Sequence, residues 1–163
     1  MNILIVYGTK HGSTKLIADM IKSSLKECDV DIVNLRESQA DVSQYDRIII
    51  GSAVYMGRIR KEVKKFIEQN INMLLEKNIG LFLCCMTEDE SEQDELVKRV
   101  FPDALIKHAM AVVIPGGEFR IDRMNIFERF IVSKIAGQKE NKSMIDNDKI
   151  ENFAEKMSKK GGV

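Results

Sequence analysis

Five short runs of apolar and largely β-branched residues recur along this chain of 163 residues. They lie at residues 3–7, 30–35, 47–51, 79–86 and 109–114. Continuous apolar runs are typical of strands that are buried on both faces of a parallel sheet. Helical patterns occupy residues 16–25, 63–75, 90–101, 121–136 and 149–158, and a polar linker is expected at 138–148. This alternation predicts one domain over residues 1–163, an α/β fold of three layers that is doubly wound around a five-stranded parallel sheet.

Charge and cysteine usage exclude several classes of protein. Lys and Arg total 25, as do Asp and Glu, so the formal net charge is zero and a general nucleic-acid binder is disfavoured. Cys28, Cys84 and Cys85 form no CxxC pair, and His11 and His108 are far apart in the sequence. We therefore expect no metal site and no disulfide framework. No apolar stretch approaches the roughly 18 residues of a membrane span, so we expect a reduced, cytoplasmic protein.

Doubly wound sheets bind ligands outside the carboxyl ends of their strands, where the strand order reverses. We therefore expect the functional site in the loops at residues 8–14, 52–60 and 86–91. The first loop lacks both GxxxxGK[ST] and GxGxxG, which disfavours the usual ATP and NAD sites. It still places hydroxyl groups at a helix N-terminus, where free N–H groups and the helix dipole favour an anion. This pattern predicts a receptor for one phosphate monoester, or else a Ser13 or Thr14 side chain that only caps the helix.

The motif Thr-Lys-His-Gly-Ser-Thr, after an Ile-Leu-Ile-Val-Tyr strand, resembles the phosphate-binding loop of the flavodoxin family. The family pattern is roughly [T/S]-x-[T/S]-G-x-[T/S], which this sequence matches at three positions but not at the middle hydroxyl, where His11 stands. Lys10 adds a positive charge that the usual loop lacks. The resemblance implies an FMN cofactor whose phosphate is held by Thr9, Lys10, His11, Gly12, Ser13 and Thr14.

The loop after the third strand supports the same resemblance. In flavodoxin-like proteins this loop wraps the isoalloxazine ring of FMN, which implies a cofactor-binding role for Ser52, Ala53, Val54, Tyr55, Met56 and Gly57. Tyr55 is the aromatic side chain that would stack on the ring, unless it is an ordinary half-buried aromatic. Gly57 permits a close backbone approach, unless it only forms a turn. The resemblance extends the FMN site to Met86, Thr87, Glu88, Gly116 and Gly117.

A closer resemblance is carried by Asp-Arg-Ile-Ile-Ile-Gly-Ser-Ala-Val-Tyr-Met-Gly-Arg and by a late F-x-x-x-R-x-x-x-F-E-R-F-I segment. Both are similar to the branch of the flavodoxin fold that includes the menaquinone-dependent protoporphyrinogen dehydrogenases. This implies an FMN oxidoreductase that passes electrons from a reduced substrate to a quinone or a redox partner protein. The alternative is a flavodoxin-type electron carrier without a substrate of its own. A response-regulator receiver is disfavoured, because the third strand ends Ile50-Gly51-Ser52 without an acceptor Asp. No catalytic side chain is identified.

The late segment 119–136 has an amphipathic pattern. Its expected apolar face carries Met124, Phe127, Ile131 and Ile135. Its cations are Arg120, Arg123, Arg129 and Lys134. Two interpretations stay open, which are core packing against the sheet and a docking surface for a membrane quinone or a redox partner.

Overall fold

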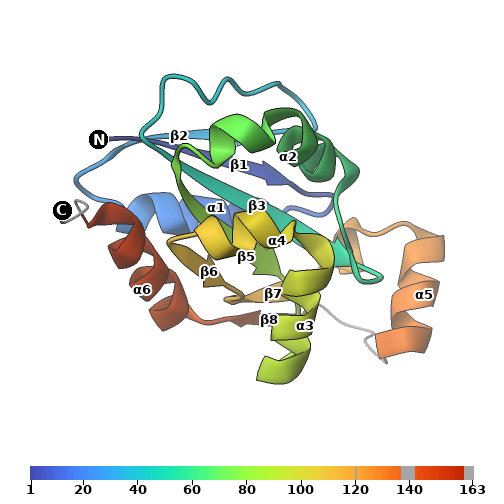
Figure 1. Cartoon of the computed structure of the whole chain (residues 1–163). Helices are drawn as coiled ribbons and strands as arrows, with labels where there is room; N and C mark the ends of the chain where they lie inside the picture. The colour runs from blue at the N-terminus through green and yellow to red at the C-terminus, as the bar shows by residue number, and fades with distance from the viewer. Residues whose placement is uncertain (120, 137–141, 160–163) are drawn as a thin grey trace.

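A central sheet of five parallel strands organises the molecule, for which a computed structural model describes residues 1–119, 121–136 and 142–159 (Figure 1). The strands are β1 (Asn2–Gly8), β2 (Asp29–Asn34), β3 (Arg47–Tyr55), β5 (Asn78–Cys84) and β6 (Ala111–Val113). Their spatial order is β2-β1-β3-β5-β6, and every neighbouring pair is parallel. The predicted five-stranded parallel sheet is confirmed, and its order reverses between β1 and β3.

Helices cover both faces of this sheet and complete the three predicted layers (Figure 1). One face carries α1 (Ser13–Ser24) and α6 (Asn147–Ser158), which pack against each other. The other face carries α2 (Lys61–Leu74), α3 (Glu90–Val100) and α4 (Asp103–His108). The short α4 was not predicted, because Pro102 favours the end of a helix. Pro102 does follow the end of α3, and it is also the N-cap of α4.

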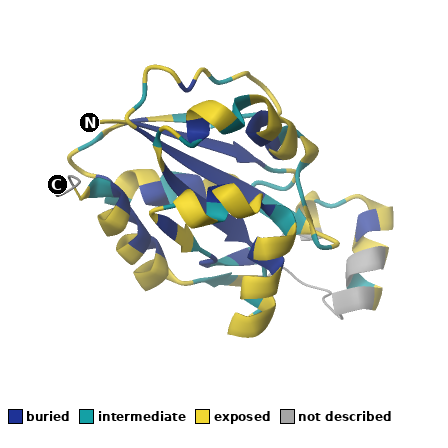
Figure 2. Ribbon diagram, in the orientation of Figure 1, coloured by how far each residue is buried: buried dark blue, intermediate teal, exposed yellow. Residues whose placement is uncertain are grey.

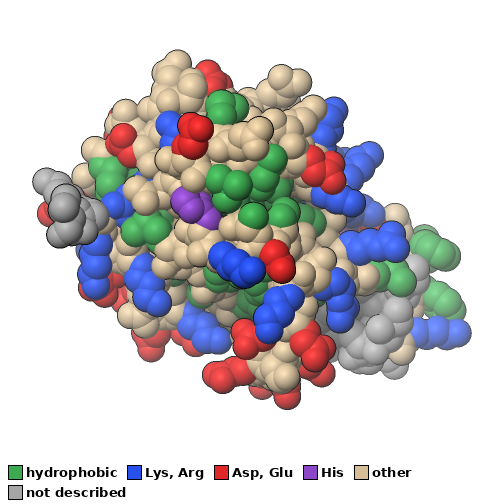
Figure 3. Space-filling view, viewed as in Figure 1, with side chains coloured by type: hydrophobic (Ala, Val, Ile, Leu, Met, Phe, Trp, Pro, Cys, Tyr) green, Lys and Arg blue, Asp and Glu red, His purple; other side chains and the backbone are tan. Residues whose placement is uncertain are grey.

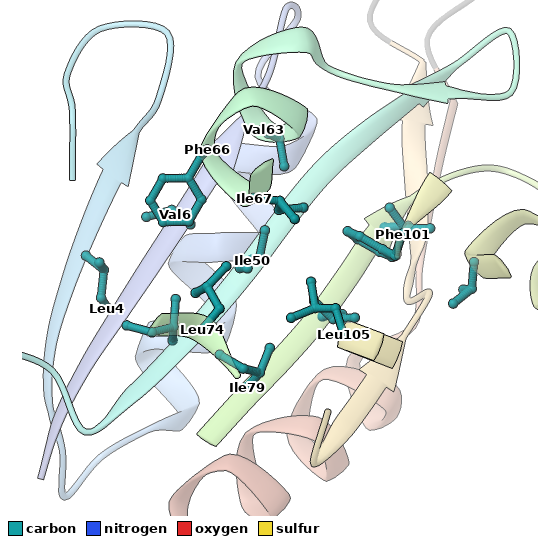
Figure 4. Packing of buried hydrophobic residues seen from close by; sticks show 14 of the residues in the cluster. Leu4, Val6, Ile50, Val63, Phe66, Ile67, Leu74, Ile79, Phe101 and Leu105 are labelled. Carbon is teal, nitrogen blue, oxygen red and sulfur yellow. The ribbon is translucent and has the colours of Figure 1, made fainter. Parts of the chain in front are cut away.

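Alternation along the strands explains why the apolar runs are continuous. Ile3 and Ile5 of β1 join the core on the α1 and α6 face, whereas Leu4 and Val6 join the core on the α2 face. The strands β1, β3 and β5 thus supply apolar side chains to both cores and are buried along most of their length (Figure 2). Figure 4 shows the second core, in which Phe66, Ile67 and Leu74 of α2 lie over the sheet.

The expected loop at 52–60 is instead largely a β-hairpin. β3 continues to Tyr55, and β4 (Arg58–Ile59) pairs with it in antiparallel register. The two residues of its turn, Met56 and Gly57, have φ values of 49° and 71°. Positive φ at both central residues defines the turn whose twist matches a hairpin. The loop assignment is therefore wrong for residues 52–55, because β-branched and aromatic residues there extend the strand.

A second sheet was missed in the region after β6. β7 (Gly116–Phe119) pairs antiparallel with β8 (Lys142–Ile145). The fifth parallel strand ends at Val113, and a separate strand begins at Gly116, whose positive φ of 104° brings its backbone close to Met144 within the second sheet. The expected linker at 138–148 is wrong for residues 142–148, which form β8 and the start of α6. Residues 138–141 lie outside the described residues.

The late amphipathic segment is broken in two, whereas one helix over 121–136 was expected. A 3₁₀ turn (Ile121–Arg123) is followed by α5 (Ile126–Ala136). The break follows from Asn125, whose side chain accepts a hydrogen bond of 2.8 Å from the Glu128 N–H and so starts a new helix. α5 stands beside the sheet and covers neither of its faces (Figure 1). Within the described residues, no helix has the length and apolar character needed to cross a bilayer.

A buried arginine joins the start of β3 to the end of α6. Arg47 is 3% exposed, and its Nη1 donates a hydrogen bond of 2.7 Å to the Met157 carbonyl. Its Nη2 donates a further hydrogen bond to the Lys159 carbonyl. Carbonyls at a helix C-terminus lack helical donors and carry partial negative charge, so they stabilise a cation. Arg47 therefore holds the last turn of α6 against the sheet.

We expect the substitution Arg47→Met to lower the free energy of unfolding by about 2–4 kcal/mol, because the buried carbonyl of Met157 and the carbonyl of Lys159 lose their donor. Chemical denaturation with urea measures this change. Lys26→Met is the matched control, since Lys26 is exposed, and it should change stability by less than about 0.5 kcal/mol. Equal stability of the two variants would show that Arg47 does not hold α6.

Candidate functional site

The first loop forms a tight cradle between β1 and α1. Gly12 is the N-cap of α1 and has a left-handed φ of 92°, and its N–H donates a hydrogen bond of 3.0 Å to Thr9 Oγ1. No side chain caps α1, so the interpretation of Ser13 or Thr14 as a cap is wrong. The first turn also contains no acidic residue. The helix therefore presents its N-terminal N–H groups to the carboxyl edge of the sheet.

Thr14 provides an independent sign that this cradle is built for a ligand. The residue is fully buried, and its Oγ1 makes no hydrogen bond of ordinary geometry within the described part of the chain. The thiol of Cys84 lies near it but is a weak partner. Burial raises the pKa of that thiol to about 12, so it stays protonated. A buried hydroxyl without a good partner costs free energy, which an anion bound in the loop would offset.

Cationic groups from several segments surround the loop. A hollow of about 420 Å³ is lined by residues 9–12 of the loop together with Lys15, Arg36, Arg123 and the acidic Glu37. Arg123 Nη1 donates a hydrogen bond of 3.2 Å to the His11 carbonyl, and Lys10 forms an ion pair with Glu128. A flavin phosphate, which is an anion, fits these donors and this charge.

Arg123 and Glu128 were not predicted as neighbours of the loop. Arg123 is one of the cations of the late amphipathic segment, for which core packing and a docking surface both stay open, and Glu128 has no predicted role. The spacing Asn125-x-x-Glu128 is a helix-start signal that is readable in the sequence. Its contact with Lys10 and His11 is not readable, because the two segments are far apart in the chain.

His11 occupies the position of the hydroxyl that the family pattern would place here. Its side chain is 22% exposed, and its Nε2 lies 3.6 Å from Glu128 Oε2. Burial and the charge of Lys10 together lower the pKa of His11 below the ordinary value of 6.5. At neutral pH the ring is therefore uncharged, and one of its two nitrogens can donate a hydrogen bond.

The hairpin lies at the same edge of the sheet as the first loop, because Gly8 of β1 pairs with Ser52 of β3. Ser52 is buried, and its hydroxyl accepts from the Arg60 N–H at 3.0 Å and donates to the Ala53 carbonyl at 2.9 Å. The Ser52 hydroxyl thus joins β3 to the residue that follows β4. Tyr55, at the tip, is 47% exposed and presents an aromatic surface to a ligand at this edge. Ala53 and Val54 are half-buried, while Met56 and Gly57 form the turn.

The third loop, Met86-Thr87-Glu88, follows β5. Two hydrogen bonds fix Thr87. Its Oγ1 donates to Glu92 Oε2 at 2.6 Å, and its carbonyl accepts from Gln93 Nε2 at 2.7 Å. These bonds tie the loop to the start of α3, over which acidic side chains gather (Figure 3). A hollow of about 450 Å³ lies between this loop and β8.

Gly116 and Gly117 lie behind the third loop. The Gly116 carbonyl accepts a hydrogen bond of 3.1 Å from the Cys85 N–H, and a Cβ atom on Gly117 would lie 3.3 Å from that nitrogen. Both glycines therefore support the backbone that leads into the loop. Their predicted contact with FMN stays a prediction.

Comparisons with known proteins identify the family of the chain. The family model described as "Flavodoxin domain" matches residues 4–146. A protein named protoporphyrinogen IX dehydrogenase [quinone] from Escherichia coli strain K12 is 21% identical over 173 aligned positions, which cover 97% of this chain and 95% of the relative.

Solved structures support the same fold. A short-chain flavodoxin associated with a PDU bacterial microcompartment superposes with a TM-score of 0.62 at 18% identity, covering 98% of this chain and 99% of its own. Rubredoxin oxygen:oxidoreductase from Desulfovibrio gigas superposes with a TM-score of 0.57 at 15% identity. That match covers 96% of this chain but 35% of the oxidoreductase.

The lowered pKa of His11 makes a prediction about stability. Below the ordinary pKa of 6.5 the unfolded chain protonates His11 while the folded protein resists protonation, so the free energy of unfolding should fall as the pH drops through that value. His11→Gln should therefore make the stability less dependent on pH between about pH 5 and pH 7. Urea denaturation of both proteins across this range measures the difference. Parallel pH profiles would contradict a lowered pKa.

Proposed function

The chain belongs to the flavodoxin domain family, and from that membership we propose that it is an FMN-dependent electron-transfer protein. The observation that carries the proposal is the buried Thr14 hydroxyl, which has no good partner in a loop that Gly12 opens toward the sheet edge. FMN supplies one- and two-electron transfer when it is bound, and the protein supplies position and electrostatics.

Each loop has a distinct part in this proposal. Residues 9–14 bind the phosphate through N–H groups and hydroxyls, and Lys10 contributes charge. The hairpin brings Tyr55 against the flavin ring. In the third loop, Glu88 places negative charge near the ring, which disfavours an additional negative charge there and so lowers the reduction potential. Thr87, fixed by Glu92 and Gln93, keeps that loop in place.

We propose further that the protein is an oxidoreductase with a reduced organic substrate and a quinone acceptor. The E. coli relative, whose name states both a protoporphyrinogen substrate and a quinone, aligns over nearly the full length of both chains. The zero net charge also supports an enzyme over a carrier, since general flavodoxins tend to be strongly acidic. The alternative is a flavodoxin-type carrier that exchanges electrons only with proteins.

α5 supports a contact with the membrane in which a quinone resides. Ile126, Phe127 and Phe130 are 87%, 71% and 56% exposed, so the expected packing of Phe127 on the sheet is wrong. Lys134 Nζ lies 4.7 Å from the centre of the Phe130 ring. Hydrophobic and cationic side chains gather over α5 at the right margin of Figure 3. Exposed aromatic side chains beside cations are typical of helices that bind anionic lipid surfaces.

Two parts of the predicted docking face change. Arg123 donates a hydrogen bond to the His11 carbonyl of the first loop, and Arg120 lies outside the described residues. The side chains of Ile131 and Ile135 also lie outside what the structure describes. The docking surface that we propose is therefore the exposed face of Ile126, Phe127, Phe130 and Lys134.

The substitution Thr14→Val tests the cofactor site. We expect FMN affinity to fall by about tenfold or more, because a hydrogen bond to a charged phosphate is lost. Stability of the flavin-free protein should not fall, because the removed hydroxyl had no good partner there. Absorption spectra after desalting and fluorescence titration measure binding, and Ser23→Ala on the exposed side of α1 is the control. Failure of the wild-type protein to retain FMN would overturn the proposed function.

Electron transfer to vesicles tests the acceptor and α5 together. Protein reduced with dithionite under argon should be reoxidised by a long-chain quinone in vesicles that contain phosphatidylglycerol. Phe127→Ser with Phe130→Ser should slow this step by about tenfold, because apolar surface is lost from the membrane contact. A water-soluble short-chain quinone should react at an unchanged rate.

Met73→Ser on α2, where Met73 is 40% exposed, is the matched control and should react with vesicles as the wild type does. Reoxidation by neither quinone would favour the protein-only carrier. Equal loss with both quinones would place the two phenylalanines in a role other than membrane contact.

A further inference from the structure

A carboxylate from α5 lies at the loop that is proposed to hold the flavin phosphate. The Glu128 side chain is 12% exposed, forms an ion pair with Lys10, and has its Oε2 3.6 Å from His11 Nε2. An acidic group is unexpected there, because the first turn of α1 contains none and cations outnumber the one acidic residue, Glu37, in the lining of the hollow. Negative charge at this position opposes a bound anion.

The same carboxylate also starts α5. Glu128 Oε2 accepts a hydrogen bond of 3.2 Å from the Asn125 N–H, and the Glu128 N–H donates a hydrogen bond of 2.8 Å to Asn125 Oδ1. These reciprocal bonds form a capping box. Arg123, just before the helix, donates a hydrogen bond of 3.2 Å to the His11 carbonyl. The start of α5 is therefore fastened to the phosphate loop by one carboxylate and one guanidinium.

Glu128 has a structural role toward Asn125 and an electrostatic role toward Lys10, and the two roles can be separated. The capping box needs only an acceptor oxygen, which Gln supplies as well as Glu. The contact with Lys10 depends on charge. A substitution of Glu by Gln therefore removes the opposing charge while the helix start is kept.

We propose that Glu128 is an internal competitor of the flavin phosphate for Lys10, and that it lowers the affinity for FMN relative to the unphosphorylated flavin. The inference rests on the proposed function. When a phosphate is bound in the loop, the Lys10 ammonium would pair with it and Glu128 would lose its ion pair. The hydrogen bond from Arg123 to the His11 carbonyl would still join the start of α5 to the loop. Glu128 is thus a specificity-determining residue that acts on the phosphate group alone.

Flavin titrations of the Glu128→Gln variant test this inference. The dissociation constants for FMN and for riboflavin are measured by quenching of flavin fluorescence. We expect the variant to bind FMN about fivefold to tenfold more tightly than the wild type does, which is the range for losing one partly buried opposing charge. Riboflavin affinity should be unchanged, because riboflavin has no phosphate.

Asn125→Ala is the matched control. It breaks the capping box and leaves the charge of Glu128, so the ratio of the two dissociation constants should stay at the wild-type value. A second test combines Glu128→Gln with Lys10→Gln, and the gain from removing Glu128 should be smaller when Lys10 is absent.

The outcomes separate this inference from the function on which it rests. If the wild type binds FMN and Glu128→Gln leaves the FMN to riboflavin ratio unchanged or lower, Glu128 does not compete with the phosphate. If Asn125→Ala produces the same gain, the effect comes from the helix start and not from charge, which also overturns the inference. If the wild type binds neither flavin, the proposed function itself fails.

Discussion

The burial of β1 and β3 on both faces is the constraint on which the site depends. Two strands that are each covered by helices on both sides run in parallel, so their carboxyl ends meet at one edge. The pairing of Gly8 with Ser52 places the first loop and the hairpin side by side. Gly8 also allows α2 to begin here, since a Cβ atom on it would lie 2.7 Å from Val63 and 2.9 Å from Arg60. Packing thus assembles the loops before any ligand contributes.

The charge along this edge differs between the first loop and the third loop. Lys10 and Arg123 lie at the first loop, whereas Asp89, Glu90 and Glu92 follow the third loop at the start of α3. The carboxylates stabilise the N-terminus of α3, and Asp89 caps it by accepting from the Glu92 N–H at 3.0 Å. One arrangement therefore has two consequences, which are a stable helix start and an electrostatic field suited to a ligand with an anionic end.

Local pattern was enough to predict most of this fold from the sequence. Apolar runs predicted all five parallel strands, and helical spacing predicted α1, α2 and α6. Each of these elements is fixed by the burial of apolar residues that are close together in the sequence. A turn at Gly57 was one of two interpretations of that glycine and is confirmed, but the hairpin was missed, since Met56 is not a residue type that favours positive φ. β7 and β8 were missed because they pair across a long separation in the chain, which no local pattern records. The first loop was selected as a candidate phosphate site from its residues, and that role stays a prediction. The contacts of Arg123 and Glu128 with this loop depend on tertiary packing, which the residues do not reveal.

Coupling between the loop and α5 has a thermodynamic consequence, if the flavin phosphate and Glu128 compete as proposed. If a bound phosphate favours release of the α5 start from the loop by some factor, release of the α5 start raises the affinity for phosphate by the same factor, because linkage is reciprocal. A surface that holds α5 away from the loop therefore raises the affinity for phosphate. The exposed apolar face of α5 and the buried Glu128 lie on the same short helix. An anionic membrane that holds this face and favours release of the α5 start would therefore tighten the flavin site, and the protein would bind its cofactor most firmly where a quinone is at hand.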